Sequence, residues 1–376
     1  MSQGIVNQMK SYQPEQIFVE RAVENSPITK NVLDRLPNVP TRSIDSTEFL
    51  LERSQRWNPT IPRSKQSLIL AHHKGNFFKP CPGRQAKAGF KGVCCNYFVI
   101  NYASNCHMEC SYCYLQSYLN FPYMTIYANQ GDLISELKTV FAGSPHDFFR
   151  IGTGELADSL ALDWLTGYST GLVEFFAQQA NAVLELKTKS DCVEYLLGLE
   201  HGGKTVVSWS MNPRYVQEKE EHKTASISQR LQAAAECARQ GYPVGFHLDP
   251  LILYPAWEPD YRDLIEDIFH RVPAASIAWI SVGSLRMTSS LKDIMRRRFP
   301  NSFLPLGELV PCPDGKMRYF KPLRVGMYRQ VLQWIREKSP TTQVYACMEG
   351  PGVWKEVFQN VPAEEDLGKE LIQCVV

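Results

Sequence analysis

Residues 101–116, NYASNCHMECSYCYLQ, carry three cysteines with the spacing Cys-x3-Cys-x2-Cys: Cys106, Cys110 and Cys113. Thiolates are the ligands that iron–sulfur clusters prefer. Three of them on one loop can bind three irons of a 4Fe–4S cubane and leave the fourth iron open. A structural zinc site needs a fourth ligand, which His107 or Cys95 could supply. The spacing and the position of the loop favour the cluster over zinc.

On either side of this loop, short apolar runs rich in β-formers alternate with longer amphipathic stretches. The alternation predicts a parallel α/β sheet with crossover helices, curled into a partial (β/α)6 TIM-type barrel. The predicted strands are 97–101, 147–152, 182–188, 205–211, 243–249, 277–283 and 343–348. The predicted helices are 131–141, 165–179, 193–200, 226–240 and 261–272.

Three segments are predicted along the chain. Residues 1–90 are rich in proline and weakly periodic, so we expect a loosely organised or short helical extension that packs on the barrel. Residues 91–350 form the barrel, and residues 351–376 form a C-terminal tail. In a barrel, functional groups gather at the carboxyl ends of the strands.

The second predicted strand ends in GTGELADS, which contains Gly152, Gly154 and Glu155. Glycines let a backbone approach a ligand closely, and the glutamate adds a carboxylate. We expect the three residues to bind a cofactor, although a Gly-x-Gly segment is commonly only a turn.

Polar groups also end the next three predicted strands. Lys189 could neutralise a ligand carboxylate or be solvated, and Ser210 and Asn212 suit polar contacts with a cofactor or lie buried in the core. His247 and Asp249 share one face of their strand, and such a pair is costly to bury unless it is hydrogen-bonded or functional. We expect these five residues to contact cofactor or substrate.

Bulk composition is that of an ordinary globular protein, with 44% hydrophobic and 21% charged residues in 376. The net charge of +1 excludes a strongly basic nucleic-acid protein. There is no apolar run of the length that spans a bilayer and no secretory signal pattern, so we expect no membrane partner and a cytoplasmic location. Eleven cysteines in such a compartment favour metal binding or reactivity over disulfides.

The cysteine spacing is the hallmark of the radical S-adenosylmethionine superfamily. Four longer stretches resemble the spore photoproduct lyase family: 110–116 (CSYCYLQ), 204–216, 230–251 and 258–269. The resemblance covers roughly residues 90–335. It implies a partial barrel in which the three cysteines bind the cluster, the open iron chelates S-adenosylmethionine, and Lys189, Ser210 and Asn212 lie near that cofactor. It also implies a reductant such as a flavodoxin or ferredoxin.

The family reaction, as the resemblance implies it, starts when a 5′-deoxyadenosyl radical removes hydrogen from a thymine dimer in DNA. A cysteine then returns hydrogen to the product radical. The position of that cysteine is occupied here by Glu155, whose O–H bond is too strong to donate a hydrogen atom readily. Cys347, at the end of the last predicted strand, is the best-placed alternative, and Tyr112 or Tyr114 could relay hydrogen. Cys81, Cys94 and Cys95 are left as inert, redox-active or metal-binding.

DNA is a weaker expectation than the cofactor. A basic run after the sixth strand could bind phosphates or form a solvated helix face: Lys292, Arg296, Arg297 and Arg298. Two other functions stay open. One is a radical enzyme acting on a different nucleotide or small molecule, and the other is a non-catalytic, zinc-stabilised nucleic-acid-binding protein.

Overall fold

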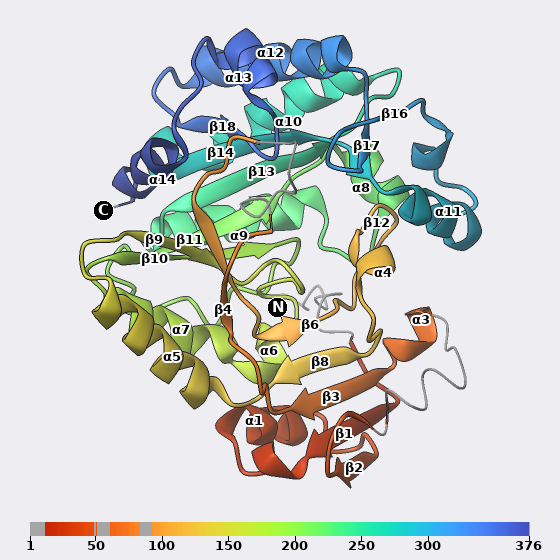
Figure 1. The fold of residues 1–376 in the computed structure, drawn as a ribbon, viewed down its shortest axis with the longest axis vertical. Coiled ribbons are helices and arrows are strands. Elements are labelled where there is room, and N and C mark those ends of the chain that lie inside the picture. The colour runs from red at the N-terminus through yellow and green to blue at the C-terminus, as the bar shows by residue number, and fades with distance from the viewer. Residues whose placement is uncertain (1–11, 49, 51–60, 83–91, 376) are drawn as a thin grey trace, which may run out of the picture.

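The computed structural model describes residues 12–48, 50, 61–82 and 92–375. Its main sheet contains seven parallel strands in the spatial order β18-β14-β13-β11-β10-β9-β5, with β4 (Phe78–Pro80) antiparallel at the β5 edge. The sheet curls into the predicted partial barrel (Figure 1). The parallel strands are β5 (Tyr97–Ile100), β9 (Phe149–Gly152), β10 (Ala182–Thr188), β11 (Thr205–Ser210), β13 (Val244–Leu251), β14 (Ile277–Ser284) and β18 (Val344–Ala346).

Each predicted barrel strand is confirmed to within a few residues. Strands β11 and β14 are buried along their whole length, as expected of parallel strands covered on both faces. Crossover helices cover the outer face of the sheet (Figure 1). They are α5 (Gln130–Gly143), α7 (Tyr168–Ala177), α9 (Ile227–Arg239), α10 (Trp257–Arg271) and α12 (Lys321–Lys338). The helices α6 (Asp163–Thr166), α8 (Arg214–Glu220) and α11 (Ser289–Arg298) belong to the connections that follow β9, β11 and β14.

The helix predicted over 193–200 is wrong, because this segment forms turns. Gly198 adopts a left-handed conformation with φ of 83°, which interrupts the helical pattern of leucines. Cys192 and Leu196 are nevertheless buried, so the segment still contributes to the core.

Residues before the barrel contain more regular structure than their sequence suggests. Strands β1 (Gln16–Glu20), β2 (Thr41–Ile44) and β3 (Ser67–Ala71) are parallel. They share a second sheet, in the order β2-β1-β3-β8-β6, with β8 (Met124–Tyr127) and β6 (Ala103–Ser104). Because β6 and β8 flank the three cysteines, this sheet joins the N-terminal segment directly to the cysteine loop. The short helices α1 (Pro27–Arg35) and α3 (Ile61–Ser64) complete this part of the fold.

The remaining elements lie around the rim and the C-terminus. Two short sheets pair β7 (Glu109–Cys110) with β12 (Glu221–His222), and β15 (Arg286–Met287) and β16 (Val310–Pro311) with β17 (Met317–Arg318). Residues predicted as a tail contain α13 (Pro351–Phe358) and α14 (Glu364–Gln373), and α13 packs on α12. Among the described residues, no helix combines the length and apolarity needed to cross a membrane.

Candidate functional site

The three cysteines of the loop pack together between β5 and the short helix α4 (Leu115–Tyr118). Cys106, Cys110 and Cys113 form no disulfide, and they share one small cluster with Cys192. Burial, together with smaller effects of Asp158 and Cys113, raises the pKa of the Cys106 thiol to about 12. Bound iron would supply the positive charge that such buried thiolates require. The donor set therefore fits an iron–sulfur cluster.

A lone metal ion fits the loop less well. Within the described ranges, no three His, Cys, Asp or Glu side chains converge on a single-ion position. Three cysteines that each bind a different iron need not converge in that way. His107, one of the two candidates for a fourth zinc ligand, is buried, and its Nδ1 has no partner within the described part of the chain.

The loop is held in place by the strand that follows α8. Strand β12 pairs antiparallel with β7, so Glu221 lies opposite Cys110. The backbone nitrogen of Ser111 donates to the carbonyl of Glu220 at 2.8 Å, and the Ser111 hydroxyl donates to the Glu220 carboxylate. These contacts fix the backbone between the second and third cysteines.

A buried network around Glu221 connects this strand to predicted site residues. Arg230 Nη2 lies 2.6 Å from Glu221 Oε2, and both side chains are fully buried. Asn212 Nδ2 donates to Glu221 Oε1 at 2.9 Å, and the Tyr112 hydroxyl donates to the same carboxylate. Burial would raise the pKa of Glu221, but Arg230 and Lys189 lower it to about 2. Asn212 and Tyr112 are therefore held by an ionised carboxylate beside the cysteine loop.

Lys189 is a half-buried cation beside this loop, which Lys65 and Arg298 contact directly. Its Nζ lies 5.7 Å from the centre of the Tyr112 ring. Burial lowers its pKa, but Glu221 and Cys110 outweigh that effect and raise it. Asp158 accepts a hydrogen bond from the Lys189 backbone nitrogen at 2.7 Å, which fixes the end of β10. A charged amine at this place can hold an anionic ligand group next to the cluster.

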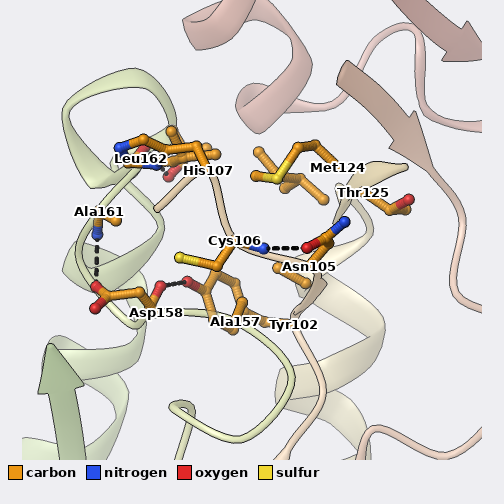
Figure 2. Close-up of a pocket in the computed structure, with 13 residues that line it drawn as sticks. Tyr102, Asn105, Cys106, His107, Met124, Thr125, Ala157, Asp158, Ala161 and Leu162 are labelled. Atoms are coloured by element: carbon orange, nitrogen blue, oxygen red, sulfur yellow. Dashed lines mark hydrogen bonds between the residues drawn. The ribbon is translucent and has the colours of Figure 1, made fainter. Parts of the chain in front are cut away.

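Asp158 also connects the loop after β9 to the cysteine loop. Its carbonyl accepts a hydrogen bond from Tyr102 at 2.7 Å, and Asn105 Oδ1 accepts one from the backbone nitrogen of Cys106 at 2.8 Å. Figure 2 shows the sulfur of Cys106 pointing into the pocket that these residues line, towards the side of Asp158 and Ala161. The predicted ligand and the loop containing Gly154 are thus neighbours.

The glycines after β9 accommodate protein side chains. A Cβ atom on Gly152 would lie 1.6 Å from the Tyr97 hydroxyl, so this glycine makes room for Tyr97. A Cβ atom on Gly154 would approach the Lys187 Cβ to 3.0 Å. The Glu155 carbonyl accepts a hydrogen bond from Tyr114 at 2.6 Å, which ties the residue to the cysteine loop.

Two lysines lie within electrostatic range of the Glu155 carboxyl group. Burial raises its pKa, whereas Lys79 and Lys187 lower it. No thiol stands at this position, and a carboxyl group cannot replace one as a hydrogen-atom donor. The structure therefore directs attention to thiols elsewhere in the barrel.

His247 belongs to a polar network in the barrel core. Its Nε2 lies 2.7 Å from Glu185 Oε1, and its Nδ1 lies 2.6 Å from the Ser281 hydroxyl. Arg150 neutralises the other oxygen of Glu185 at 3.1 Å. Burial lowers the pKa of His247 although Glu185 opposes it. Both ring nitrogens already have protein partners, so the geometry gives His247 a structural role and its cofactor contact stays a prediction.

Asp249 and Cys347 lie within electrostatic range of each other at the carboxyl ends of β13 and β18, the two strands that flank β14. Arg286 donates to both carboxylate oxygens of Asp249, at 3.1 and 2.8 Å. The thiol of Cys347 is within electrostatic range of Asp249, Arg286 and Cys81. Burial, reinforced by Asp249, raises the pKa of Cys347 to about 11, so this thiol stays protonated at neutral pH.

Two residues of the basic run after β14 contact other parts of the protein and are not free to bind phosphate. Arg298 donates to Glu109 at 2.5 Å and to the side chain of Gln116, so it braces the cysteine loop. Lys292 donates to the carbonyl of Gly307 at 3.3 Å. Only Arg296 and Arg297 of the run are exposed.

Sequence reasoning missed the residues that hold the loop: Glu220, Glu221, Arg230, Glu109 and Arg298. Most lie in charge-rich segments such as EKEEHK (218–223), which resemble a solvated helix face. A buried carboxylate is recognised only when its partner is known, and the partners here are 9 to 189 residues away.

A curled parallel sheet with a three-cysteine loop at its rim, a half-buried cation beside that loop and a thiol at the carboxyl end of β18 defines an enzyme of the radical S-adenosylmethionine class. The family model described as "SPL: Spore photoproduct lyase" matches residues 91–338, about two thirds of the sequence. The chain therefore belongs to the spore photoproduct lyase family.

Curated relatives and solved structures agree with this assignment. The chain is 29% identical over 266 residues to a spore photoproduct lyase of Geobacillus sp. (strain Y412MC61), covering 69% of this chain and 76% of the relative. It is 28% identical over 239 residues to that of Bacillus subtilis (strain 168), covering 63% and 68%. A spore photoproduct lyase structure complexed with dinucleoside spore photoproduct has a TM-score of 0.77 at 23% identity, covering 89% of this chain and 99% of that one. A variant with bound AdoMet and the same dinucleoside has a TM-score of 0.76 at 22% identity, with the same coverage.

Membership in this lyase family excludes the non-catalytic zinc protein as the account of the whole chain. The fold likeness confirms the partial barrel. The individual site residues, the three segment boundaries and the cytoplasmic location stay predictions.

Proposed function

We propose that this protein repairs the spore photoproduct, a thymine dimer in DNA, by radical chemistry. Cys106, Cys110 and Cys113 would hold a 4Fe–4S cluster. When bound, the cluster supplies one electron to S-adenosylmethionine, which splits into methionine and a 5′-deoxyadenosyl radical able to abstract hydrogen. The observation that carries the proposal is the packing of three unpaired thiols on one braced loop at the rim of the barrel.

The residues around the loop have distinct parts in holding the cofactor. Lys189 would neutralise the methionine carboxylate, because its amine lies beside Tyr112 and within electrostatic range of Cys110. Ser210, at the end of β11, is buried and pairs in register with His247 of β13, so the two side chains lie on the same face of the sheet. Asn212 would act through Glu221, because its amide is bonded to that carboxylate.

Cys347 is the thiol that we assign as hydrogen-atom donor. In this step the S–H bond of Cys347 breaks, a C–H bond forms on the product radical, and the unpaired electron stays on sulfur. A donor must be protonated, and burial keeps this thiol in its S–H form. Tyr114 lies within electrostatic range of both Cys113 and Cys81, and Cys81 lies within range of Cys347. Tyr114 would therefore be a candidate to pass hydrogen between the cofactor and that sulfur, as would Tyr112.

One observation favours a second candidate function. Glu155 stands between Lys79 and Lys187 at the position where the family resemblance expects the donor thiol. A substrate that presents a hydrogen-bond donor to a carboxylate would use this residue. The second candidate is therefore a radical enzyme of the same class acting on a different nucleotide or a small molecule.

The experiment that separates the two candidates uses the anaerobically reconstituted protein with dithionite, S-adenosylmethionine and a dinucleotide spore photoproduct. Conversion of the lesion to the undamaged thymine dinucleotide supports repair. Deoxyadenosine formed without any loss of the lesion supports the second candidate and contradicts the first.

A further inference from the structure

Four elements from distant parts of the sequence meet around the cysteine loop. Helices α3, α4 and α11 and strand β12 gather at one edge of the molecule, on the right of Figure 1. Each is attached to the loop. Lys65, just after α3, donates to the Met108 carbonyl at 2.7 Å. Helix α4 follows Cys113 directly, β12 pairs with β7, and Arg298 of α11 binds Glu109. This edge is therefore the outer wall of the proposed cluster site.

The exposed charged side chains of α3, α4, β12 and α11 are cationic except for Asp293. We call Arg63, Lys223, Arg296 and Arg297 the cationic patch, since all four are exposed. Among the described residues, Arg296 forms an ion pair with Asp293 at 3.9 Å, and the other three cations of the patch form none. The ring of His222 stacks on Phe299 with 5.7 Å between centres, which places the turn carrying Lys223 next to the end of α11.

The patch lies close to the cysteines. Lys223 lies within electrostatic range of His107, the residue after Cys106. Tyr118, on α4 and five residues after Cys113, is 57% exposed among these cations. One turn of helix therefore separates an exposed aromatic side chain from a proposed cluster ligand.

We propose that the cationic patch docks an acidic one-electron carrier protein that reduces the cluster. This inference rests on the proposed function, because only a redox cluster needs such a donor. The strand ends at Asp249 and Cys347 are assigned to substrate, so electrons must enter from another side. Opposite charges on the partners speed a transient encounter without requiring a large interface.

Nucleic acid is the other polyanion that such a patch could attract. The structure favours the protein carrier for two reasons. Arg298, the residue of the basic run nearest the loop, is occupied by Glu109 and Gln116 and is not free for phosphate. The patch also borders the cysteine loop, where an electron donor is needed, whereas the substrate side chains come from β13 and β18.

The test compares two charge-reversal variants with equal changes of net charge. The patch variant carries Lys223→Glu, Arg296→Glu and Arg297→Glu. The control carries Lys30→Glu, Lys138→Glu and Lys369→Glu, all exposed on α1, α5 and α14, away from this edge. Bleaching of the visible iron–sulfur absorption is followed after mixing with reduced flavodoxin at low ionic strength, and separately with dithionite. Neither substrate nor S-adenosylmethionine is needed.

We expect flavodoxin to reduce the patch variant at least about tenfold more slowly than the wild type or the control. Added salt should bring the wild type towards the patch variant, because screening removes the attraction. The rate with dithionite should change by less than about twofold, since this reductant needs no docking surface.

Three results would overturn the inference. The first is an equal flavodoxin rate in the patch variant and the control. The second is an equal loss with dithionite, which would mean that the substitutions damage the cluster. The third is a loss of DNA affinity with an unchanged flavodoxin rate, which would assign the patch to nucleic acid. A protein that assembles no cluster would instead overturn the proposed function together with this surface.

Discussion

Arg230 and Glu221 form a fully buried ion pair, with Arg230 Nη2 2.6 Å from Glu221 Oε2, directly behind the strand that holds Cys110. Removing one partner of such a pair leaves an uncompensated charge in the interior. Arg230→Leu should therefore lower the free energy of unfolding by about 3–5 kcal/mol. Chemical denaturation at neutral pH measures this change. A loss below about 1 kcal/mol would show that water or another cation compensates Glu221.

Bracing of the cysteine loop by Arg298 should control how well the cluster is retained. Arg298→Ala removes the bond to Glu109, and the loss of such supporting contacts lowers metal affinity about 10- to 100-fold in known sites. Iron and sulfide content after anaerobic reconstitution and desalting measures retention. Arg297→Ala is the matched control, because this neighbour on α11 is exposed. Equal iron content in both variants would contradict the bracing role.

Cys347 should control which product leaves the barrel. Cys347→Ala removes the S–H bond that quenches the product radical, so the yield of repaired dinucleotide should fall about tenfold or more while deoxyadenosine is still formed, in line with the loss of a reacting group. Chromatography of the dinucleotide products shows whether the radical is diverted to other adducts. Cys374→Ala is the control, because that thiol is exposed near the C-terminus. An unchanged product distribution in Cys347→Ala would exclude this thiol as the donor.

Asp163 should make stability depend on pH in an unusual direction. Burial raises its pKa from the ordinary value of 3.8 to about 6, although hydrogen bonds from Ser169 oppose the shift. The folded state therefore binds the proton more tightly than the unfolded state. The protonated form stabilises the fold below pH 3.8, and this contribution is lost as pH rises through about 6.

Asp163→Asn cannot ionise, so it should be more stable than the wild type at pH 7.5 by about 3 kcal/mol, an advantage that is largely lost near pH 4. Urea unfolding of both proteins over this pH range measures the difference. A difference that stays constant from pH 4 to pH 7.5 would show that Asp163 does not titrate in this range.

The sequence was sufficient for the barrel because its strands are continuous apolar runs separated by amphipathic helices. The residues of β14, IAWISVGS, are buried without exception, and such a run has one interpretation in an α/β chain. The capping box of α9, Ser226 with Gln229, likewise marks a helix start through local bonds. The segment 193–200 was mispredicted because the left-handed backbone of Gly198 carries no periodic signal.

Some residues of the site are indicated by local sequence, whereas others depend on contacts between distant segments. The spacing of Cys106, Cys110 and Cys113 is local information, so the sequence alone proposes them as cluster ligands. The roles of Glu221 and Arg298 depend on partners that folding brings together, so a glutamate in a charged run and an arginine in a basic run looked solvated. The sequence predicts that His247 contacts the cofactor, which stays a prediction, and only the fold shows that Glu185 and Ser281 are its hydrogen-bond partners.

The most direct test of the central claim is the amount of 5′-deoxyadenosine formed from S-adenosylmethionine by the anaerobically reconstituted, dithionite-reduced protein. We predict about four irons per chain, from the 4Fe–4S assignment, and deoxyadenosine that is absent in Cys106→Ala, Cys110→Ala and Cys113→Ala. A colourless protein with stoichiometric zinc and no deoxyadenosine, unaffected by those three substitutions, would contradict the account.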